Sequence, residues 1–484
     1  MKLINVDYPV KRSWLADQGL RLDASPYLSG SFEAKQVLKE LTVRKDALVS
    51  LTTGHNGGIF NGPKFSRLYL QDPARAVRFL GSTDMMEADL SYLPLLATSV
   101  ADKFSYLQIK PDTTLISCSG TIGRMAYVRQ DMADIWSSQH IMKVQPDPDR
   151  IPPGYLNTFL RSRFGVPIIT SQAYGAIIQH IEPHHIADLP VPRFGVELEQ
   201  RIHDLVEEAA NLRTDFQHGV VAATEDLFIT AGLAQLLDLH WHEQDRDLGF
   251  PVFGVGPTSL RAMNYGYRAR QIHDALSSVP HRTLGEICEG GQLARGNRVP
   301  RQDVDGEFGI PFVGQRTAFW VRPEYRTILP PHGFNPFVPD ETVLVGAQGL
   351  PSENGLLGRG LFVTGAWLKF AFTEHLLRVV SGSRDIAGAY LGAFFRSEAA
   401  FRLLRSMMAG TGPQSLHPAL LRAVPIPTLT PEARTRIAET TREAYQKRDE
   451  ADLKEDQALA LLESAVFEHA GSSGGTGQGT GAGG

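Results

Sequence analysis

The sequence predicts an α+β protein that is a tandem duplication, with two globular α/β domains each followed by a long helix. The first observation is that residues 154–162 (GYLNTFLRS) and 389–397 (AYLGAFFRS) share five of nine positions. The second is that the same repeat offset, which aligns Gly154 with Ala389, also aligns Pro190 and Pro192 with Pro425 and Pro427. The third is that a long charged stretch with helical periodicity follows each proline pair. One register over so many positions indicates duplication of a unit of about 210 residues.

The bulk composition limits the class of protein. A chain of 484 residues exceeds what one core usually supports, and 42% hydrophobic with 21% charged residues is ordinary for a globular protein. No apolar run approaches the ~20 residues that span a bilayer, and the N-terminus lacks the apolar core of a signal peptide. We therefore expect a cytoplasmic protein without membrane contact. Cys118 and Cys288 lie in different repeats and imply no disulfide framework.

The net charge of −5 is not typical of a protein that binds nucleic acid alone. Three explanations stay open from composition. DNA binding is absent, or basic residues are concentrated locally, or a partner supplies much of the phosphate contact.

The first repeat begins with a lead-in, residues 1–45, which contains a short helical pattern over 32–41. A globular domain is expected over 46–195, with short β-type runs such as 114–117. It closes with Pro190-Val191-Pro192, where prolines at alternate positions forbid a helix and force an extended segment.

The first long helix is predicted over 196–230. Its apolar positions follow a 4-3-4-3-4 spacing through Ala209, which is a heptad seam flanked by charged and amide residues. The other seam residues are Leu198, Ile202, Leu205, Leu212 and Phe216. One interpretation is a packing element of its own domain. The duplication favours another, in which the two long helices pair as a rigid antiparallel coiled-coil spacer with pseudo-two-fold symmetry.

The second repeat has the same order of parts. A connector with the second lead-in covers 231–280, and the second domain covers 281–428. The second long helix, 429–469, opens with Pro431-Glu432, a favourable first turn, and has a seam of smaller residues that includes Ile437. Residues 470–484 are rich in Gly and Ser, which predicts a disordered tail.

Glycine-rich loops with basic and amide side chains recur at equivalent places in the two repeats. Glycine lets the backbone approach a partner closely, and Arg, Lys and Gln supply donors that read base edges in the major groove. The alternative is an ordinary surface turn with solvated charges. The candidate DNA contacts are Lys64, Arg67, Arg124 and Gln172 in the first repeat, and Arg295, Arg298, Arg301 and Gln414 in the second.

We find no convincing catalytic set. The sequence has no Walker A motif and no dinucleotide-binding glycine motif between a strand and a helix. His180, Glu182, His184 and His185 are interrupted by Pro183, which breaks any regular metal-ligand spacing. We expect no metal, no cofactor and no catalysis on this chain, which favours a recognition or scaffold component over an enzyme whose site is not recognised.

The ordered motifs resemble the specificity (S) subunits of Type I restriction-modification systems, the HsdS family. Residues 115–124 (LISCSGTIGR) resemble the family's hydrophobic–Ser–Gly-Thr–Gly segment, and 155–162 followed by 190–192 resemble its run from helix to Pro-x-Pro. Glu199-Gln200-Arg201-Ile202 resembles the start of its helical region. The resemblance covers about 20–465, although the second repeat lacks the Ser-Gly-Thr-Ile-Gly form and has Thr435 where the first has Gln200.

The resemblance implies a non-catalytic subunit with two target-recognition domains that read a bipartite site in double-stranded DNA. The paired helices would dock two methyltransferase (M) subunits, which carry S-adenosylmethionine, and a restriction/translocase (R) subunit is a further partner in complexes that cleave. The departures from the family pattern also allow a related defence or modification system with an S-like subunit. The alternative from another class is a protein–protein scaffold that never binds DNA.

Overall fold

The computed structural model describes residues 12–17, 27, 30–173, 179–245, 258–333 and 335–471, and shows a mixed α and β protein. Its residues form two compact units. Unit 1 comprises 1–86, 93–214 and 450–484, and unit 2 comprises 87–92 and 215–449. The predicted tail lies outside the described residues from position 472 onward.

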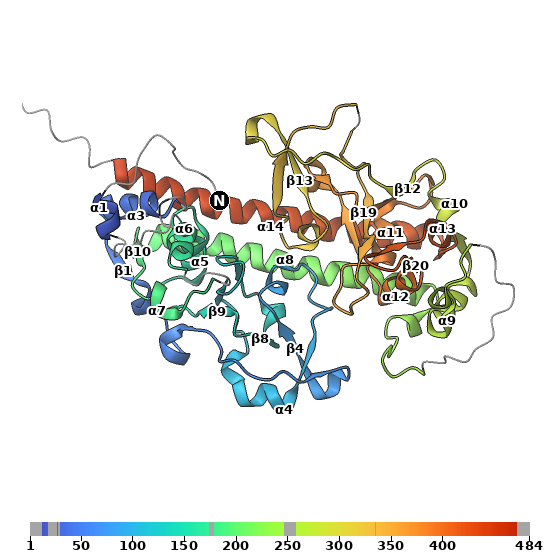
Figure 1. The fold of residues 1–484 in the computed structure, drawn as a ribbon, viewed down its shortest axis with the longest axis horizontal. Helices are drawn as coiled ribbons and strands as arrows, with labels where there is room; N and C mark the ends of the chain where they lie inside the picture. The colour runs from blue at the N-terminus through green and yellow to red at the C-terminus, as the bar shows by residue number, and fades with distance from the viewer. Residues whose placement is uncertain are drawn as a thin grey trace, which may run out of the picture. The chain divides into compact units, whose positions relative to one another are not determined.

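A four-stranded antiparallel sheet with the same topology lies in each unit (Figure 1). In both sheets the last strand along the chain lies between the first and the second strands and pairs with both, and the third strand forms an edge. The order in unit 1 is β2 (Ile59–Phe60), β9 (Ile141–Val144), β6 (Thr114–Ser117), β7 (Met125–Tyr127). The order in unit 2 is β12 (Gln292–Arg295), β19 (Leu376–Val380), β15 (Thr342–Gly346), β17 (Gly360–Val363).

Two consecutive helices follow each sheet, and a serine at the equivalent position of each repeat lies between them. Ser162 donates through Oγ to the carbonyl of Phe159 at 2.7 Å and accepts from the amide of Gly165 at 3.2 Å. Ser397 donates to Phe394 at 2.7 Å and accepts from the amide of Ala400 at 3.0 Å. The helices are α5 (Pro153–Arg161) and α6 (Gly165–Ser171), and α11 (Gly388–Phe395) and α12 (Glu398–Ser406). Ser397 is the N-cap of α12, whereas Ser162 is the C-cap of α5 and accepts an amide at the start of α6.

The Pro-x-Pro segments form short strands, as predicted. β10 (Pro190–Pro192) pairs with β1 (Lys45–Ala47), and β22 (Pro425–Pro427) pairs with β11 (His281–Thr283). Each pair is an isolated two-stranded ribbon, where a proline that lacks a backbone donor is tolerated. These ribbons lead directly into the two long helices.

The remaining elements complete each unit. In unit 1 they are α1 (Arg12–Asp17), α3 (Ser31–Glu40), β3 (Tyr69–Leu70), β4 (Ala76–Leu80), β5 (Leu95–Ala97), α4 (Thr98–Ala101), β8 (Ile135–Ser137) and α7 (Pro183–Ile186). In unit 2 they are α9 (Tyr267–Ser277), α10 (Leu284–Ile287), β13 (Ile310–Val313), β14 (Tyr325–Ile328), β16 (Gln348–Gly349), β18 (Ala371–Phe372), β20 (Met408–Ala409), β21 (Gln414–Leu416) and α13 (Pro418–Arg422). The second sheet of unit 1 has the order β3-β5-β4-β8, whereas unit 2 has two three-stranded sheets, β14-β13-β18 and β16-β21-β20.

The two long helices, α8 (Val196–Thr230) and α14 (Pro431–Gly471), contribute to the core of each unit. In unit 1, Ile202 and Val206 of α8 share a core with Leu462 and Val466 of α14. In unit 2, Phe216 of α8 packs its ring 5.0 Å from that of Tyr445 of α14. Among the described residues, none of the helices has the length and apolar content that crossing a bilayer requires.

The buried positions of α8 are displaced by one residue from part of the predicted seam. Ile202 and Phe216 are buried as the heptad pattern suggests, but Leu198, Leu205 and Leu212 are only half-buried. Ala209 of the predicted seam is also buried, and the buried positions outside that seam include Val206, Arg213 and Val220. The heptad pattern did not predict this register because it places a charged residue such as Arg213 at the surface. In the structure, Asp452 and Glu455 of α14 pair with Arg213, so its cation is buried in the seam. Ile437 of α14 is fully buried.

A six-residue segment from the first half of the sequence belongs to unit 2. The amide of Ala88 donates to the carbonyl of Phe319 at 2.9 Å, and Asp89 pairs with Arg396 at 3.0 Å. The ring of Tyr92 lies 5.0 Å from that of Phe401. The predicted domain 46–195 therefore does not coincide with one compact unit, because Glu87–Tyr92 packs with the other.

Candidate nucleic-acid interface

Three loops meet at the same end of the four-stranded sheet in each unit. In unit 1 the amide of Cys118 donates to the carbonyl of His140, and the amide of Ile181 donates to the carbonyl of Cys118, both at 3.0 Å. In unit 2 the amide of Ala347 donates to His375 at 3.0 Å, and Leu416 donates to Ala347 at 3.3 Å. The repeat offset aligns His140 with His375 and Ile181 with Leu416. The two units thus gather corresponding loops at corresponding ends of their sheets.

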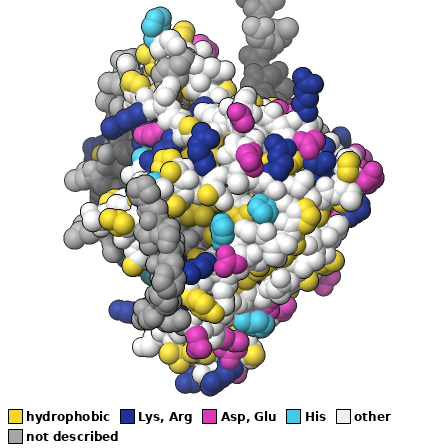
Figure 2. Space-filling view, turned by 90° about the vertical axis from the view of Figure 1, so that its right-hand side faces the viewer, with side chains coloured by type: hydrophobic (Ala, Val, Ile, Leu, Met, Phe, Trp, Pro, Cys, Tyr) yellow, Lys and Arg dark blue, Asp and Glu magenta, His cyan; other side chains and the backbone are white. Residues whose placement is uncertain are grey.

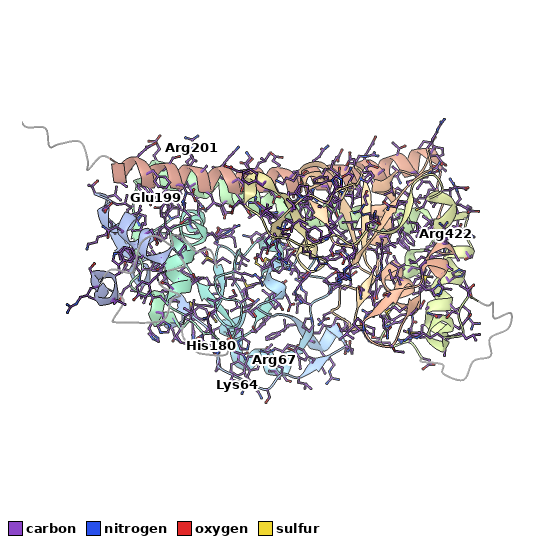
Figure 3. The ribbon with its side chains drawn as sticks, turned by 45° about the horizontal axis from the view of Figure 1, so that its top comes forward. Lys64, Arg67, His180, Glu199, Arg201 and Arg422 are labelled. Atoms are coloured by element: carbon purple, nitrogen blue, oxygen red, sulfur yellow. The ribbon has the colours of Figure 1, made fainter. Side chains whose placement is uncertain are left out.

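Two of the predicted contacts in unit 1 lie on the segment that follows β2. Lys64 and Arg67 are exposed, and Figure 3 shows them on the same side of unit 1 as His180. The Arg67 guanidinium donates to Oε1 of Gln139 at 2.7 Å. Burial, and then the positive charges of Arg67 and His180, lower the pKa of His140. These basic side chains therefore sit close to the three-loop junction.

The hairpin that carries Arg124 depends on glycine. Gly120 and Gly123 have φ of 75° and 86°, which is left-handed backbone that L side chains rarely adopt. A Cβ at Gly123 would also meet Cγ2 of Thr170 at 2.4 Å. The Arg124 amide donates to Oγ of Ser117 at 2.9 Å, and its side chain is half-buried. The Ser-Gly-Thr-Ile-Gly form thus fits a tight turn after β6.

The predicted contacts of unit 2 fall into different environments. Arg298 is exposed in the segment after β12. Arg295 donates through Nη2 to the carbonyl of Ala347 at 2.6 Å, and burial lowers its pKa. Arg301 pairs with Glu374 at 3.2 Å. Arg295 thus braces the three-loop junction, whereas Arg298 is exposed to solvent.

The two predicted glutamines also differ in their surroundings. Gln414 begins β21 opposite Gly349, and its Oε1 is buried without a hydrogen-bond partner within the described part of the chain. Gln172 follows α6 and lines a cavity beside α3 and β1. In the sequence, Gln172 begins the segment between α6 and α7 that also contains Ile181 of the three-loop junction.

Two basic residues, Lys143 and Arg378, were not predicted from the sequence. Each lies on an inner strand of the four-stranded sheet of its unit. Lys143 on β9 is 1% exposed, donates through Nζ to the carbonyl of Ile141 at 3.0 Å, and has its pKa lowered by burial to about 7. Arg378 on β19 donates to the carbonyl of Pro336 at 3.0 Å, and burial lowers its pKa. The repeat offset aligns Lys143 with Arg378, so the duplication could have identified both.

The histidines that resembled a metal set have a structural role. Nδ1 of His185 accepts the backbone amide of Glu182 at 2.9 Å, and the two residues form the capping box of α7. The rings of His184 and His185 lie 4.0 Å apart. In the described ranges, no cluster of three or more His, Cys, Asp or Glu side chains is placed to hold a metal ion.

Ion pairs connect α8 and α14 inside each unit. In unit 1, Arg213 pairs with Asp452 at 2.7 Å and with Glu455 at 3.0 Å, and Arg213 is 5% exposed. In unit 2, Lys447 pairs with Asp215 at 2.9 Å. A second pair in unit 2 joins Arg436 and Asp226 at 2.7 Å. From Asp215 to Asp226 the residue numbers rise along α8, while those of their partners on α14 fall from Lys447 to Arg436. The paired segments therefore run antiparallel.

The start of α8 is fixed by a buried carboxylate. Glu199 is 1% exposed, accepts the amide of Phe194 at 3.0 Å, and pairs with Arg193 at 2.7 Å. Arg193 also pairs with Asp46 on β1 at 2.9 Å. The glutamate of the Glu-Gln-Arg-Ile motif therefore joins the helix to the ribbon that precedes it, whereas Arg201 is exposed (Figure 3).

Basic residues are not gathered into one patch on the face shown in Figure 2. Lys and Arg side chains alternate there with Asp and Glu. This agrees with the small net negative charge of the chain, −5. Phosphate attraction over that face is therefore weak, and a DNA contact on that face would rest on particular side chains.

No protein-family model and no curated protein matches this chain. Among solved structures, the chain is similar to S subunits of Type I restriction-modification systems. The S subunit from M. genitalium is 12% identical, with 89% of this chain and 96% of that chain covered and a TM-score of 0.37. The HsdS subunit from Thermoanaerobacter tengcongensis is 13% identical, with 87% and 96% covered and a TM-score of 0.27.

A third structure, from work on complex assembly and conformational transition of the type I R-M system, is 13% identical, with 87% and 97% covered and a TM-score of 0.24.

Proposed function

We propose that this chain is the non-catalytic DNA-sequence-specificity subunit of a Type I or Type I-like restriction-modification complex. Each unit reads one half of a bipartite site in double-stranded DNA. The observation that carries the proposal is the three-loop junction, which both units build with corresponding hydrogen bonds. The exposed side chains nearby differ, with Lys64 and Arg67 in unit 1 and Arg298 in unit 2. One scaffold with two sets of side chains suits a target with two different half-sites.

The paired helices support the second part of the proposal, a spacer that fixes the gap between half-sites. Antiparallel ion pairs such as Arg213–Asp452 in unit 1 and Lys447–Asp215 in unit 2 hold the helices in register. The spacer docks two M subunits, which carry S-adenosylmethionine and the catalytic groups, and an R subunit where DNA is also cleaved. M subunits would share neutralisation of the phosphates, which fits the net charge of this chain.

One observation favours a second candidate, a protein–protein scaffold. The mixed charges in Figure 2 suit a protein partner at least as well as a phosphate backbone. The two functions differ in salt dependence. Reading DNA requires duplex affinity that falls steeply as salt rises, whereas a scaffold assembles without any duplex affinity.

Mapping of DNA methylation in source cells with and without the gene tests the proposal. The expected result is loss of methylation at one split motif with a fixed gap, restored by the wild-type gene. The assembled complex should bind a duplex that carries this motif more tightly than a scrambled duplex. An unchanged methylation map together with no duplex affinity of the assembled complex would refute the proposal in favour of the scaffold.

A further inference from the structure

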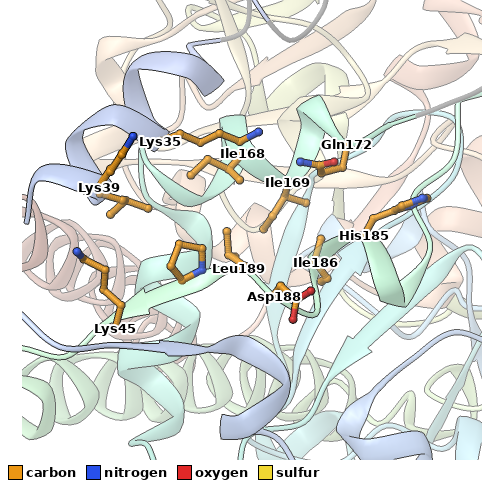
Figure 4. Close-up of a pocket in the computed structure, with 12 residues that line it drawn as sticks. Lys35, Lys39, Lys45, Ile168, Ile169, Gln172, His185, Ile186, Asp188 and Leu189 are labelled. Carbon is orange, nitrogen blue, oxygen red and sulfur yellow. The ribbon is translucent and has the colours of Figure 1, made fainter. Parts of the chain in front are cut away.

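A cavity of about 510 Å³ lies in unit 1 beside α3, α6, α7 and β10 (Figure 4). Its wall is largely apolar, and Ile168, Ile169 and Ile186 are buried there. Small-molecule sites commonly have about 300–1,000 Å³ and a mostly apolar lining with a few polar groups. The cavity therefore has the size of a small-ligand site.

The polar groups of the lining are predominantly cationic. Lys35 and Lys39 are one turn apart on α3, so they share a face of that helix. Lys45 on β1 donates to the carbonyl of Leu41 at 2.7 Å, which occupies one of the three N–H groups of its ammonium. Among the described lining residues, the one carboxylate is that of Asp188, which is exposed. Three ammonium groups against one carboxylate favour an anion.

Amide and imidazole donors complete the lining opposite the lysines in Figure 4. Gln172 and His185 are labelled there, across the cavity from Lys39 and Lys45. Because Nδ1 of His185 accepts the amide of Glu182, the neutral ring carries its proton on Nε2 and is a donor there. Donors thus line both sides of an apolar floor.

Unit 2 keeps the floor of this region and, as Arg270, the cation that corresponds to Lys35, but not the other polar groups compared below. At the repeat offset, Leu403, Leu404 and Leu421 replace the three isoleucines and are buried. The polar positions change in character: Lys39 corresponds to Asp274, Gln172 to Met407, and His185 to Leu420. The same local fold therefore forms without these polar groups, so packing does not explain their presence in unit 1.

We propose that this cavity binds a small organic anion. An apolar body of about one or two rings packs against Ile168, Ile169 and Leu189, and a carboxylate, sulfonate or phosphate group lies between Lys39 and Lys45. Charge-assisted hydrogen bonds from the ammonium groups hold the anion, and the apolar floor provides the hydrophobic contribution that a bare phosphate could not use. The site is independent of the proposed reading of DNA.

The test is a fluorescence titration of the full chain with anilinonaphthalene sulfonate, compared with the uncharged phenylnaphthylamine. We expect saturable one-to-one binding of the sulfonate and weaker binding of the uncharged probe. Lys39→Ala and Lys45→Ala should each weaken sulfonate binding by about threefold to tenfold. Lys110→Ala, an exposed lysine of unit 1 outside the cavity, is the matched control and should bind like the wild type.

A variant that is expected to gain affinity gives the sharper criterion. Asp188→Asn removes the carboxylate of the described lining and should tighten sulfonate binding, which a partly unfolded variant could not do at unchanged stoichiometry. Equal affinity for the two probes, no saturable binding, or lysine variants that match the Lys110→Ala control would each overturn the proposal. Thermal unfolding of every variant verifies that the fold is kept.

Discussion

The Tyr390 hydroxyl donates a 2.8 Å hydrogen bond to the carbonyl of Pro427, and Tyr155 makes the same bond to Pro192. The repeat offset aligns the two tyrosines and the two prolines, and both tyrosines are fully buried. Each bond ties the helix after the sheet to the Pro-x-Pro strand that leads into a long helix. It therefore fixes the position from which α8 or α14 departs.

Removing this bond should destabilise unit 2. Tyr390→Phe leaves the buried carbonyl of Pro427 without its donor, which we expect to cost about 1–3 kcal/mol. The measurement is the shift of the urea unfolding midpoint. Tyr325→Phe is the matched control, because Tyr325 is 56% exposed and its change should fall within about 0.5 kcal/mol. Equal midpoints for the two variants would show that the bond contributes nothing.

The buried arginine of α8 should matter more than the exposed pair nearby. Arg213→Ala removes the buried cation that pairs with Asp452 and with Glu455, which also pairs with Arg161, and breaking a buried pair costs about 3–5 kcal/mol. Lys447→Ala removes a partner of the exposed Asp215, where about 0–1 kcal/mol is expected. Urea unfolding of the two variants, read from helical circular dichroism, tests the order. The opposite ranking would contradict a structural role for Arg213 in the seam.

Lys143 predicts a pH dependence of stability. Its pKa is lowered by burial from 10.5 to about 7, so between these values the unfolded state binds more protons than the folded one. Stability from this group therefore rises with pH across that window, by at most about 1.4 kcal/mol per pH unit.

Lys143→Met has no ammonium group that could bind or release a proton, so its stability is compared with that of the wild type. Its advantage in unfolding free energy over the wild type should be largest near pH 7 and shrink as the pH approaches 10.5. Urea midpoints measured at several pH values give the difference directly. A constant difference across the window would mean that the lysine is not desolvated as the structure indicates.

The exposed basic residues should act on separate half-sites. Arg298→Ala should relax specificity for one half of the DNA motif, and Arg67→Ala for the other, by about 1–3 kcal/mol if each reads a base. Competition binding with duplexes mutated in one half at a time measures this in the assembled complex. Equal weakening of both halves would identify a phosphate contact, and no effect would remove the residue from the interface.

Lengthening both long helices should lengthen the gap in the DNA site. One heptad inserted at facing positions of α8 and α14 adds about 10 Å, equivalent to about three base pairs. Methylation mapping reads the new gap. The same insertion in α8 alone is the control and should disrupt the pairing. An unchanged gap with intact methylation would refute the spacer.

Much of the fold was predictable because a duplication is visible in one sequence. α8 starts at Val196, the predicted position, and α14 starts at Pro431 rather than at the predicted 429, since the Pro-x-Pro strands end the domains before them. The register of the α8 seam was only partly predictable, because Arg213 is buried by virtue of carboxylates on α14, in the other half of the sequence.

The candidate interface was less predictable. Residue type identified Arg295 and Arg301 as donors, but not that a backbone carbonyl and Glu374 already accept from them. Which donors are occupied depends on loops distant in sequence, so local pattern cannot decide it. Gln172 shows the same limit, since its place in the wall of a cavity depends on α3 and β1.

The segment Glu87–Tyr92 has a consequence for modular evolution of the chain. An exchange of residues 46–195 for the corresponding block of another protein would break the ion pair between Asp89 and Arg396. It would also break the contact between the ring of Tyr92 and the Arg359 guanidinium, which lies 3.9 Å from the ring centroid. Arg396 and Arg359 would then be left in unit 2 without those contacts. Natural or laboratory recombinants of this protein should therefore tolerate new half-site specificities only when this short segment is inherited together with unit 2.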